Sequence, residues 1–67
     1  MPMTPAEFKQ ARQTLGLTQA QLALVLGYGT PQISFMETGA NPIRRVVKIA
    51  VLAMVAGYRP DGWPNPA

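Results

Sequence analysis

The sequence predicts an all-α fold, with four short helices in one compact domain and a proline-rich tail without helix. Helix-capping residues recur along the chain, each ahead of a segment whose apolar residues repeat at helical spacing. Glycine follows each segment, at positions 16, 27, 39 and 57, where a left-handed residue ends a helix most easily. No stretch alternates apolar and polar residues with the period of two typical of a strand, so we predict no sheet.

Two capping boxes open the first two expected helices. In each, a threonine is followed three residues later by Glu or Gln, so that side chain and backbone can satisfy each other at the helix start. The boxes are Thr4 with Glu7, ahead of residues 5–15, and Thr18 with Gln21, ahead of residues 19–26. Apolar pairs in the pattern of a hydrophobic staple flank them: Met3 with Phe8, and Leu17 with Leu22.

The third expected helix follows a glycine-rich turn at residues 27–29 and covers residues 30–38. Gly29 and Thr30 are both acceptable as its N-cap, and the sequence leaves that choice open.

Asn41 and Pro42 predict the start of a fourth helix over residues 42–56, because asparagine caps helices and proline suits their first position. Beyond it, prolines and a Pro-Asp-Gly turn in residues 58–67 exclude further long helix.

Composition limits the class of protein. The chain has 67 residues, and a domain of this size buries only roughly 60% of its unfolded surface. It contains no cysteine and no histidine, which excludes disulfides and thiolate metal sites and removes the commonest general base. We therefore expect no enzyme and no cofactor. The net charge of +3 is compatible with a nucleic-acid partner.

No segment predicts export or membrane insertion. Residues 1–7 lack the pattern of a secretory signal, and the longest apolar run, residues 49–56, is shorter than the roughly 20 residues that a membrane span needs. We expect a cytoplasmic protein with no membrane partner.

The second and third expected helices have the pattern of a helix-turn-helix, in which two short helices meet steeply across a short turn that often contains glycine. Ala23 is small where the two helices must approach, and Gly27 ends the first of them. The other residues that such packing buries are Leu22, Leu26, Ile33 and Met36.

These residues resemble the Cro and phage-repressor family, also called the xenobiotic-response-element type. The resemblance covers residues 8–56 and includes Leu-Thr-Gln-x-x-Leu-Ala at 17–23, Ile-Ser at 33–34 and Glu-x-Gly at 37–39. It implies a lambda-repressor-like helical domain over residues 1–57, whose third helix enters the major groove of double-stranded DNA and reads base edges there.

Carried onto this chain, the resemblance places base contacts at Thr30, Pro31, Gln32, Ser34 and Phe35. Gln32 is the best candidate for a paired contact, because its amide matches N6 and N7 of adenine, and Phe35 fits apolar contact with a thymine methyl group. The third helix has no lysine or arginine, so the common arginine–guanine contact is not available from it. The plainer interpretation of Gln32 and Ser34 is solvated surface.

Phosphate contacts are expected around that helix. Gln19 resembles the family glutamine that meets a phosphate, at a helix N-terminus whose dipole favours an anion. The full expected set is Gln19, Lys9, Asn41, Arg44 and Arg45. The charged members are otherwise an ordinary solvated surface.

Arg12 and Glu37 resemble a family ion pair that ties the first helix to the end of the third. Without that pairing they would be two separate surface charges.

The fourth expected helix predicts a second subunit. Between residues 43 and 56 only Arg44, Arg45 and Lys48 are not apolar, and three small helices can cover only one face of such a helix. We expect a C2 homodimer whose recognition helices lie about 34 Å apart on a palindromic operator. The expected interface is Val47, Val51, Met54, Val55, Tyr58 and Trp63.

The sequence thus favours a transcriptional regulator, most simply a small phage-like repressor that acts by occupying its operator. One alternative is an antitoxin-like regulator that also binds a protein partner through the fourth helix and the tail. Another is an interaction module whose helix-turn-helix has lost DNA binding, which only the absence of basic residues in the third helix supports.

Overall fold

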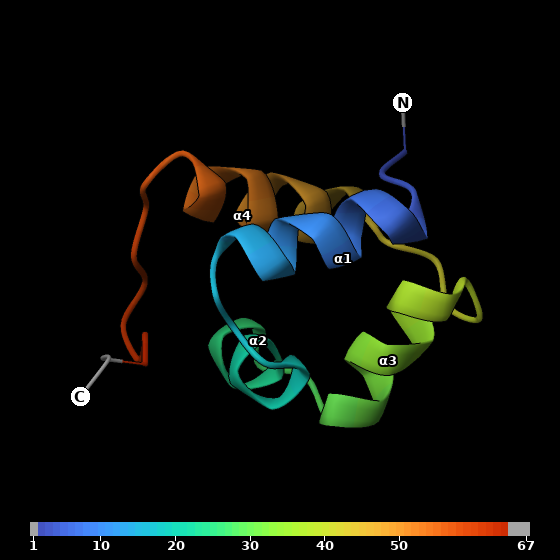
Figure 1. Ribbon diagram of the computed structural model, residues 1–67, viewed down its shortest axis with the longest axis horizontal. Helices are drawn as coiled ribbons and strands as arrows, with labels where there is room; N and C mark the ends of the chain where they lie inside the picture. Colours follow the sequence, from blue (N-terminus) through green and yellow to red (C-terminus); the bar gives the residue numbers. More distant parts are fainter. Residues whose placement is uncertain (1, 65–67) are drawn as a thin grey trace.

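The computed structural model describes residues 2–64, and these contain four helices and no strand. The helices are α1 (Pro5–Thr14), α2 (Gln19–Leu26), α3 (Thr30–Thr38) and α4 (Arg45–Val55). In Figure 1, α1 and α4 run side by side along the top, and α2 and α3 lie below them. The predicted all-α fold is confirmed. None of the described helices is long and apolar enough to cross a membrane.

Both predicted capping boxes are present. The Glu7 N–H donates to the Thr4 hydroxyl oxygen (3.1 Å) and the Thr4 N–H donates to the Glu7 carboxylate (2.8 Å). Thr18 and Gln21 make the same two bonds at 3.1 and 2.9 Å. The staple residues behind these caps, Met3, Phe8, Leu17 and Leu22, are buried. Local sequence therefore fixes the starts of α1 and α2, with about 1 kcal/mol expected from each cap.

Gly29 is the N-cap of α3, which settles the choice that the sequence left open. Gly27, in the left-handed conformation at φ 79°, ends α2, and the Tyr28 N–H then donates to the Ala23 carbonyl oxygen (2.9 Å). An L side chain at this φ would be strained, so glycine is required where the chain turns from α2 into α3.

The predicted start of α4 is wrong. The helix begins at Arg45 with Arg44 as its N-cap, and not at Pro42. The Asn41 N–H donates to the carbonyl oxygen of Phe35 (3.2 Å), so Asn41 belongs to the turn that ends α3. Ile43 packs on the core from the connecting loop. Residues 42–44 therefore form the connection to α4, although an Asn-Pro pair by itself favours a helix start.

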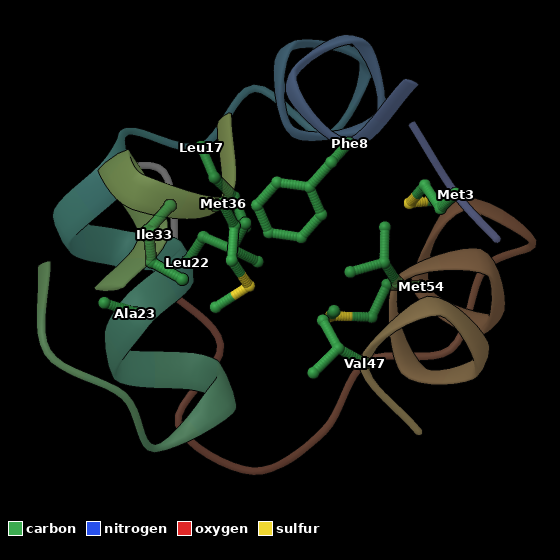
Figure 2. Close-up of a cluster of buried hydrophobic side chains, with 10 residues drawn as sticks. Met3, Phe8, Leu17, Leu22, Ala23, Ile33, Met36, Val47 and Met54 are labelled. Carbon is green, nitrogen blue, oxygen red and sulfur yellow. The ribbon is translucent and has the colours of Figure 1, made fainter. Parts of the chain in front are cut away.

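The core draws side chains from all four helices and the segments beside them (Figure 2): Met3, Phe8, Leu17, Leu22, Ala23, Ile33, Met36, Val47, Val51 and Met54. Figure 2 shows the ring of Phe8 pointing into the space between Met36 on one side and Met54 on the other. Since α1 packs on both α3 and α4, Phe8 links the helix pair α2 and α3 to α4.

This packing overturns part of the predicted dimer interface. Val47, Val51 and Met54 are at most 4% exposed, because they fill the core of their own chain. Their apolar character was recognised in the sequence, but the direction in which they face was not. Trp63 is half-buried and also packs against this chain's core.

The tail turns back along the domain from the end of α4 (Figure 1) and forms no helix over residues 58–64. Arg59 holds it: its Nη1 donates to the Met54 carbonyl oxygen (2.7 Å), and its guanidinium lies 4.3 Å from the centre of the Trp63 ring. The last part of the predicted tail, residues 65–67, lies outside the described residues.

Candidate nucleic-acid interface

The second and third helices pack against each other across the turn at residues 27–29. Leu22 and Ile33 are fully buried between them, and Ala23 is 2% exposed. Small and apolar residues thus stand where the two helices approach, and α3 is left with one side open to solvent.

The open side of α3 is a stripe formed by Pro31, Phe35 and Thr38, which are all exposed. Their spacing of four and three residues places them on one face of the helix. Phe35 is 48% exposed, whereas the other phenylalanine, Phe8, is fully buried. Among the other predicted base-contact residues, Thr30 and Gln32 are exposed and Ser34 is half-buried. Thr38 was missed, although its position three residues after Phe35 was a usable signal.

The predicted ion pair between α1 and α3 is present. Arg12 Nε donates to Glu37 Oε2 (2.6 Å) and Arg12 Nη2 donates to Glu37 Oε1 (3.2 Å). Arg12 Nη1 also donates to the Leu17 carbonyl oxygen (2.9 Å). The Arg12 and Glu37 side chains are 14% and 5% exposed, so the pair is largely shielded from water.

Gln19 joins this pair. Its Nε2 donates to Glu37 Oε1 (3.2 Å), which ties the start of α2 to the end of α3. A phosphate contact by Gln19 would therefore use the second hydrogen of that amide or the backbone N–H at the start of α2. The resulting polar network of Arg12, Gln19 and Glu37 links three of the helices and fixes the orientation of α3.

The charge of Glu37 is stabilised within this network. Partial burial raises the pKa of Glu37, but the hydrogen bonds from Arg12 and Gln19 and the charges of Arg12 and Lys9 outweigh it. The pKa therefore lies below its ordinary value. Lys9, exposed on α1, is close enough to Glu37 to contribute, which places one predicted phosphate contact beside the polar network.

A surface hollow runs along α3 next to the loop that precedes α4. It is lined by Tyr28, Gln32, Met36, Asn41, Pro42, Arg44 and Val47. The fold thereby gathers Gln32, Asn41 and Arg44, which the sequence proposed as DNA contacts from separate elements. Tyr28 is a further polar group in this hollow, and nothing in the sequence distinguished it from an ordinary turn residue.

Arg45 is separated from this group. It lines a different hollow with Pro2, Ile43, Lys48 and Ile49. Arg44 and Arg45 are adjacent in sequence, yet only Arg44 lies beside α3.

Gln32 is tied to the start of its own helix. Its Oε1 accepts a hydrogen bond from the Gly29 N–H at 2.7 Å. A paired contact with adenine needs the amide oxygen as acceptor and the amide nitrogen as donor. In this conformation the oxygen caps α3 and keeps its second lone pair, so an adenine contact would share that oxygen with the cap.

A second surface is formed by the outer side of α4. Val46, Ile49, Leu52 and Val55 are 67%, 60%, 46% and 44% exposed, and we call them the α4 surface. Of the predicted interface residues, Val55 lies on it and Tyr58, 61% exposed, follows it.

No group of three or more His, Cys, Asp or Glu side chains among residues 2–64 is arranged to hold a metal ion.

A family model described as helix-turn-helix matches residues 8–53, which run from Phe8 in α1 to Ala53 in α4 and include the polar network and all of α3. No curated protein and no solved structure matches the chain significantly.

Proposed function

The chain belongs to the helix-turn-helix family of the Cro and phage-repressor type and is a DNA-binding transcription regulator; we propose that it represses transcription by occupying a palindromic operator as a homodimer. The observation that carries this proposal is the exposed side of α3, which the polar network holds in one orientation. An α-helix with its side chains is about 10 to 12 Å in diameter, which fits the major groove, about 12 Å wide.

The groups around α3 support a DNA interface. Lys9 and the start of α2 lie near the polar network, and Asn41 and Arg44 lie in the hollow along α3. Positive and hydrogen-bonding groups beside a recognition helix fix its register through phosphate contacts, while the helix reads base edges. We assign Lys9, Gln19, Asn41 and Arg44 to phosphates and Thr30, Pro31 and Phe35 to bases.

The homodimer rests on the α4 surface. Four large aliphatic side chains on one short helix are more than scattered surface exposure. A hollow extends the patch onto α1, and its lining includes apolar and polar residues: Met3, Ala6, Ala11, Leu52 and Val55, with Glu7, Gln10 and Thr14. A C2 dimer brings the same patch of two copies together. It also presents two α3 helices to successive major grooves about 34 Å apart, as a palindrome requires.

The experiment that tests this function is selection of bound sequences from a random duplex library. At roughly physiological salt, non-specific phosphate binding is weakened, so enrichment reports base reading. We expect an enriched palindrome. Enrichment of no sequence by folded protein would contradict the proposal. If the protein instead co-purified with a tightly bound second protein on the α4 surface, the antitoxin-like alternative would replace the homodimer.

A further inference from the structure

The side of α3 that faces solvent carries no charge. Glu37 is the one ionisable residue between Thr30 and Thr38, and it is turned inward onto Arg12 with only 5% of its side chain exposed. Direct reading of guanine relies most often on arginine or lysine. The exposed stripe of Pro31, Phe35 and Thr38 offers neither.

Amide reading of adenine is also disfavoured on this helix. Gln32 is the one amide side chain in α3, and its oxygen accepts from the Gly29 N–H at 2.7 Å. An adenine contact would have to share this oxygen with the cap, which limits how far the amide can turn toward a base. For the hydrogen-bonding edges of guanine and adenine, the exposed side of α3 therefore offers threonine hydroxyls and an amide that also serves as a cap, but no charged side chain.

Apolar groups in the major groove are well matched to the exposed side of α3. Pro31 and Phe35 are four residues apart on the open side of α3, and Phe35 leaves 48% of its surface available for contact. The apolar features in the major groove are methyl groups on C5 of pyrimidines, and phenylalanine and the threonine methyl both contact them.

We infer that α3 reads C5-methyl groups in the major groove, with Phe35 as the main specificity-determining residue and Pro31 beside it. This inference rests on the proposed DNA-binding function and names the chemical feature of the operator that the site recognises. Thymine and 5-methylcytosine both carry this group, so the operator half-site should contain methyl-bearing positions opposite Phe35.

The test uses the operator obtained by selection, made as synthetic duplexes. Each thymine is replaced in turn by deoxyuridine, which removes the C5-methyl group and leaves base pairing unchanged. At the sensitive positions, 5-methylcytosine is then compared with cytosine. We expect about fourfold weaker binding for each contacted methyl that is removed. A similar gain from 5-methylcytosine over cytosine would show that the methyl group is read from either base.

Variants assign the effect to Phe35. At the position opposite Phe35, Phe35→Ala should bind thymine and deoxyuridine operators equally, and Phe35→Leu should keep part of the difference. Leu24→Ala is the matched control, since Leu24 is a 75% exposed apolar residue on α2 and outside α3. It should retain the full preference for thymine.

The outcomes are distinct. A specific operator whose affinity is unchanged by deoxyuridine overturns the inference and leaves the proposed function intact. A methyl effect that persists in Phe35→Ala overturns the assignment to Phe35. Enrichment of no operator at all overturns the proposed function, and the inference with it.

Discussion

The first three helices and the fourth are held in different ways. α1 and α2 begin with complete capping boxes, and the network of Arg12, Gln19 and Glu37 fastens both to α3. By contrast, α4 begins at Arg45, and its N-cap Arg44 makes no side-chain capping bond. One side of α4 packs on the apolar core, and the charge of Lys48 helps to lower the pKa of Glu7 on α1, while the α4 surface is open on the other side.

This contrast separates two tasks. The polar bonds of the first three helices have defined directions, so they hold α3 in one orientation. The apolar packing of α4 is less directional, and its uncovered side has the chemistry of an interface.

Removing Glu37 should destabilise the first three helices more than any other change considered. Glu37→Ala leaves Arg12 largely shielded from water without its partner, which costs roughly 3 to 5 kcal/mol in comparable buried pairs. We expect the free energy of unfolding to fall by an amount of this order in thermal or urea denaturation. Glu7→Gln, an exposed carboxylate in the α1 cap, is the control and should change stability much less. A melt of Glu37→Ala that matched the parent protein would contradict the role given to the polar network.

Truncating a side chain should cost much more stability on the inner side of α4 than on its outer side. Met54→Ala removes a side chain that is 1% exposed and should cost about 2 to 5 kcal/mol. Ile49 lies on the outer side and is 60% exposed, so Ile49→Ala should change monomer stability by less than about 0.5 kcal/mol. Both values should be measured at low protein concentration, because a dimer would make stability concentration-dependent. Equal losses for the two variants would refute the assigned orientation of α4.

Low pH should lower the stability of the first three helices through protonation of Glu37. Its pKa is lower in the folded chain than the unfolded value of about 4.3, so folding favours the ionised form. The stabilisation is fully present above the unfolded pKa and is lost as the pH falls through the folded pKa. We expect a smaller acid-induced loss of stability in Glu37→Gln than in the parent protein. Thr4 also lowers the pKa of Glu7, first through its backbone hydrogen bond. Part of the change in the free energy of unfolding with pH should therefore remain in Glu37→Gln. Identical slopes in urea titrations at pH 3 to 7 would exclude Glu37 as the cause.

The smallest effect concerns the start of α4, where stability and DNA binding should change in opposite directions. Arg44→Ser supplies the missing N-cap and should raise the free energy of unfolding by about 1 kcal/mol. It also removes a cation beside α3, and should reduce the salt dependence of operator binding by about one phosphate contact. Arg45→Ser is the matched control: it follows the cap and lines a different hollow, so neither change is expected at comparable size.

The parts of the fold that could be predicted are those fixed by neighbouring residues. Thr4, Thr18 and Gly27 act within a few positions of themselves, so the starts of α1 and α2 and the turn into α3 followed from the sequence. The start of α4 did not, because it depends on the turn in which Asn41 is held and on the core contact of Ile43.

The candidate site shows the same limit. The Arg12–Glu37 pair followed from the resemblance to a family, since it joins positions that are far apart in the chain. The facing of α4 could not be predicted, because a helix that is apolar on nearly all sides has no sequence signal for its inner side. The bonds from Gly29 to Gln32 and from Gln19 to Glu37 also appear only when the side chains are placed in space.

The most direct test of the central claim is to run the random-duplex selection in parallel with the parent protein and with Ile49→Glu, which places a charge on the α4 surface. We expect the parent protein to enrich a palindrome with half-sites about one helical turn, or about 34 Å, apart. Ile49→Glu should remain folded and enrich a single half-site of the same sequence. Enrichment of no sequence by the parent protein would contradict DNA reading by α3. The same palindrome with the same spacing from both proteins would contradict the α4 dimer.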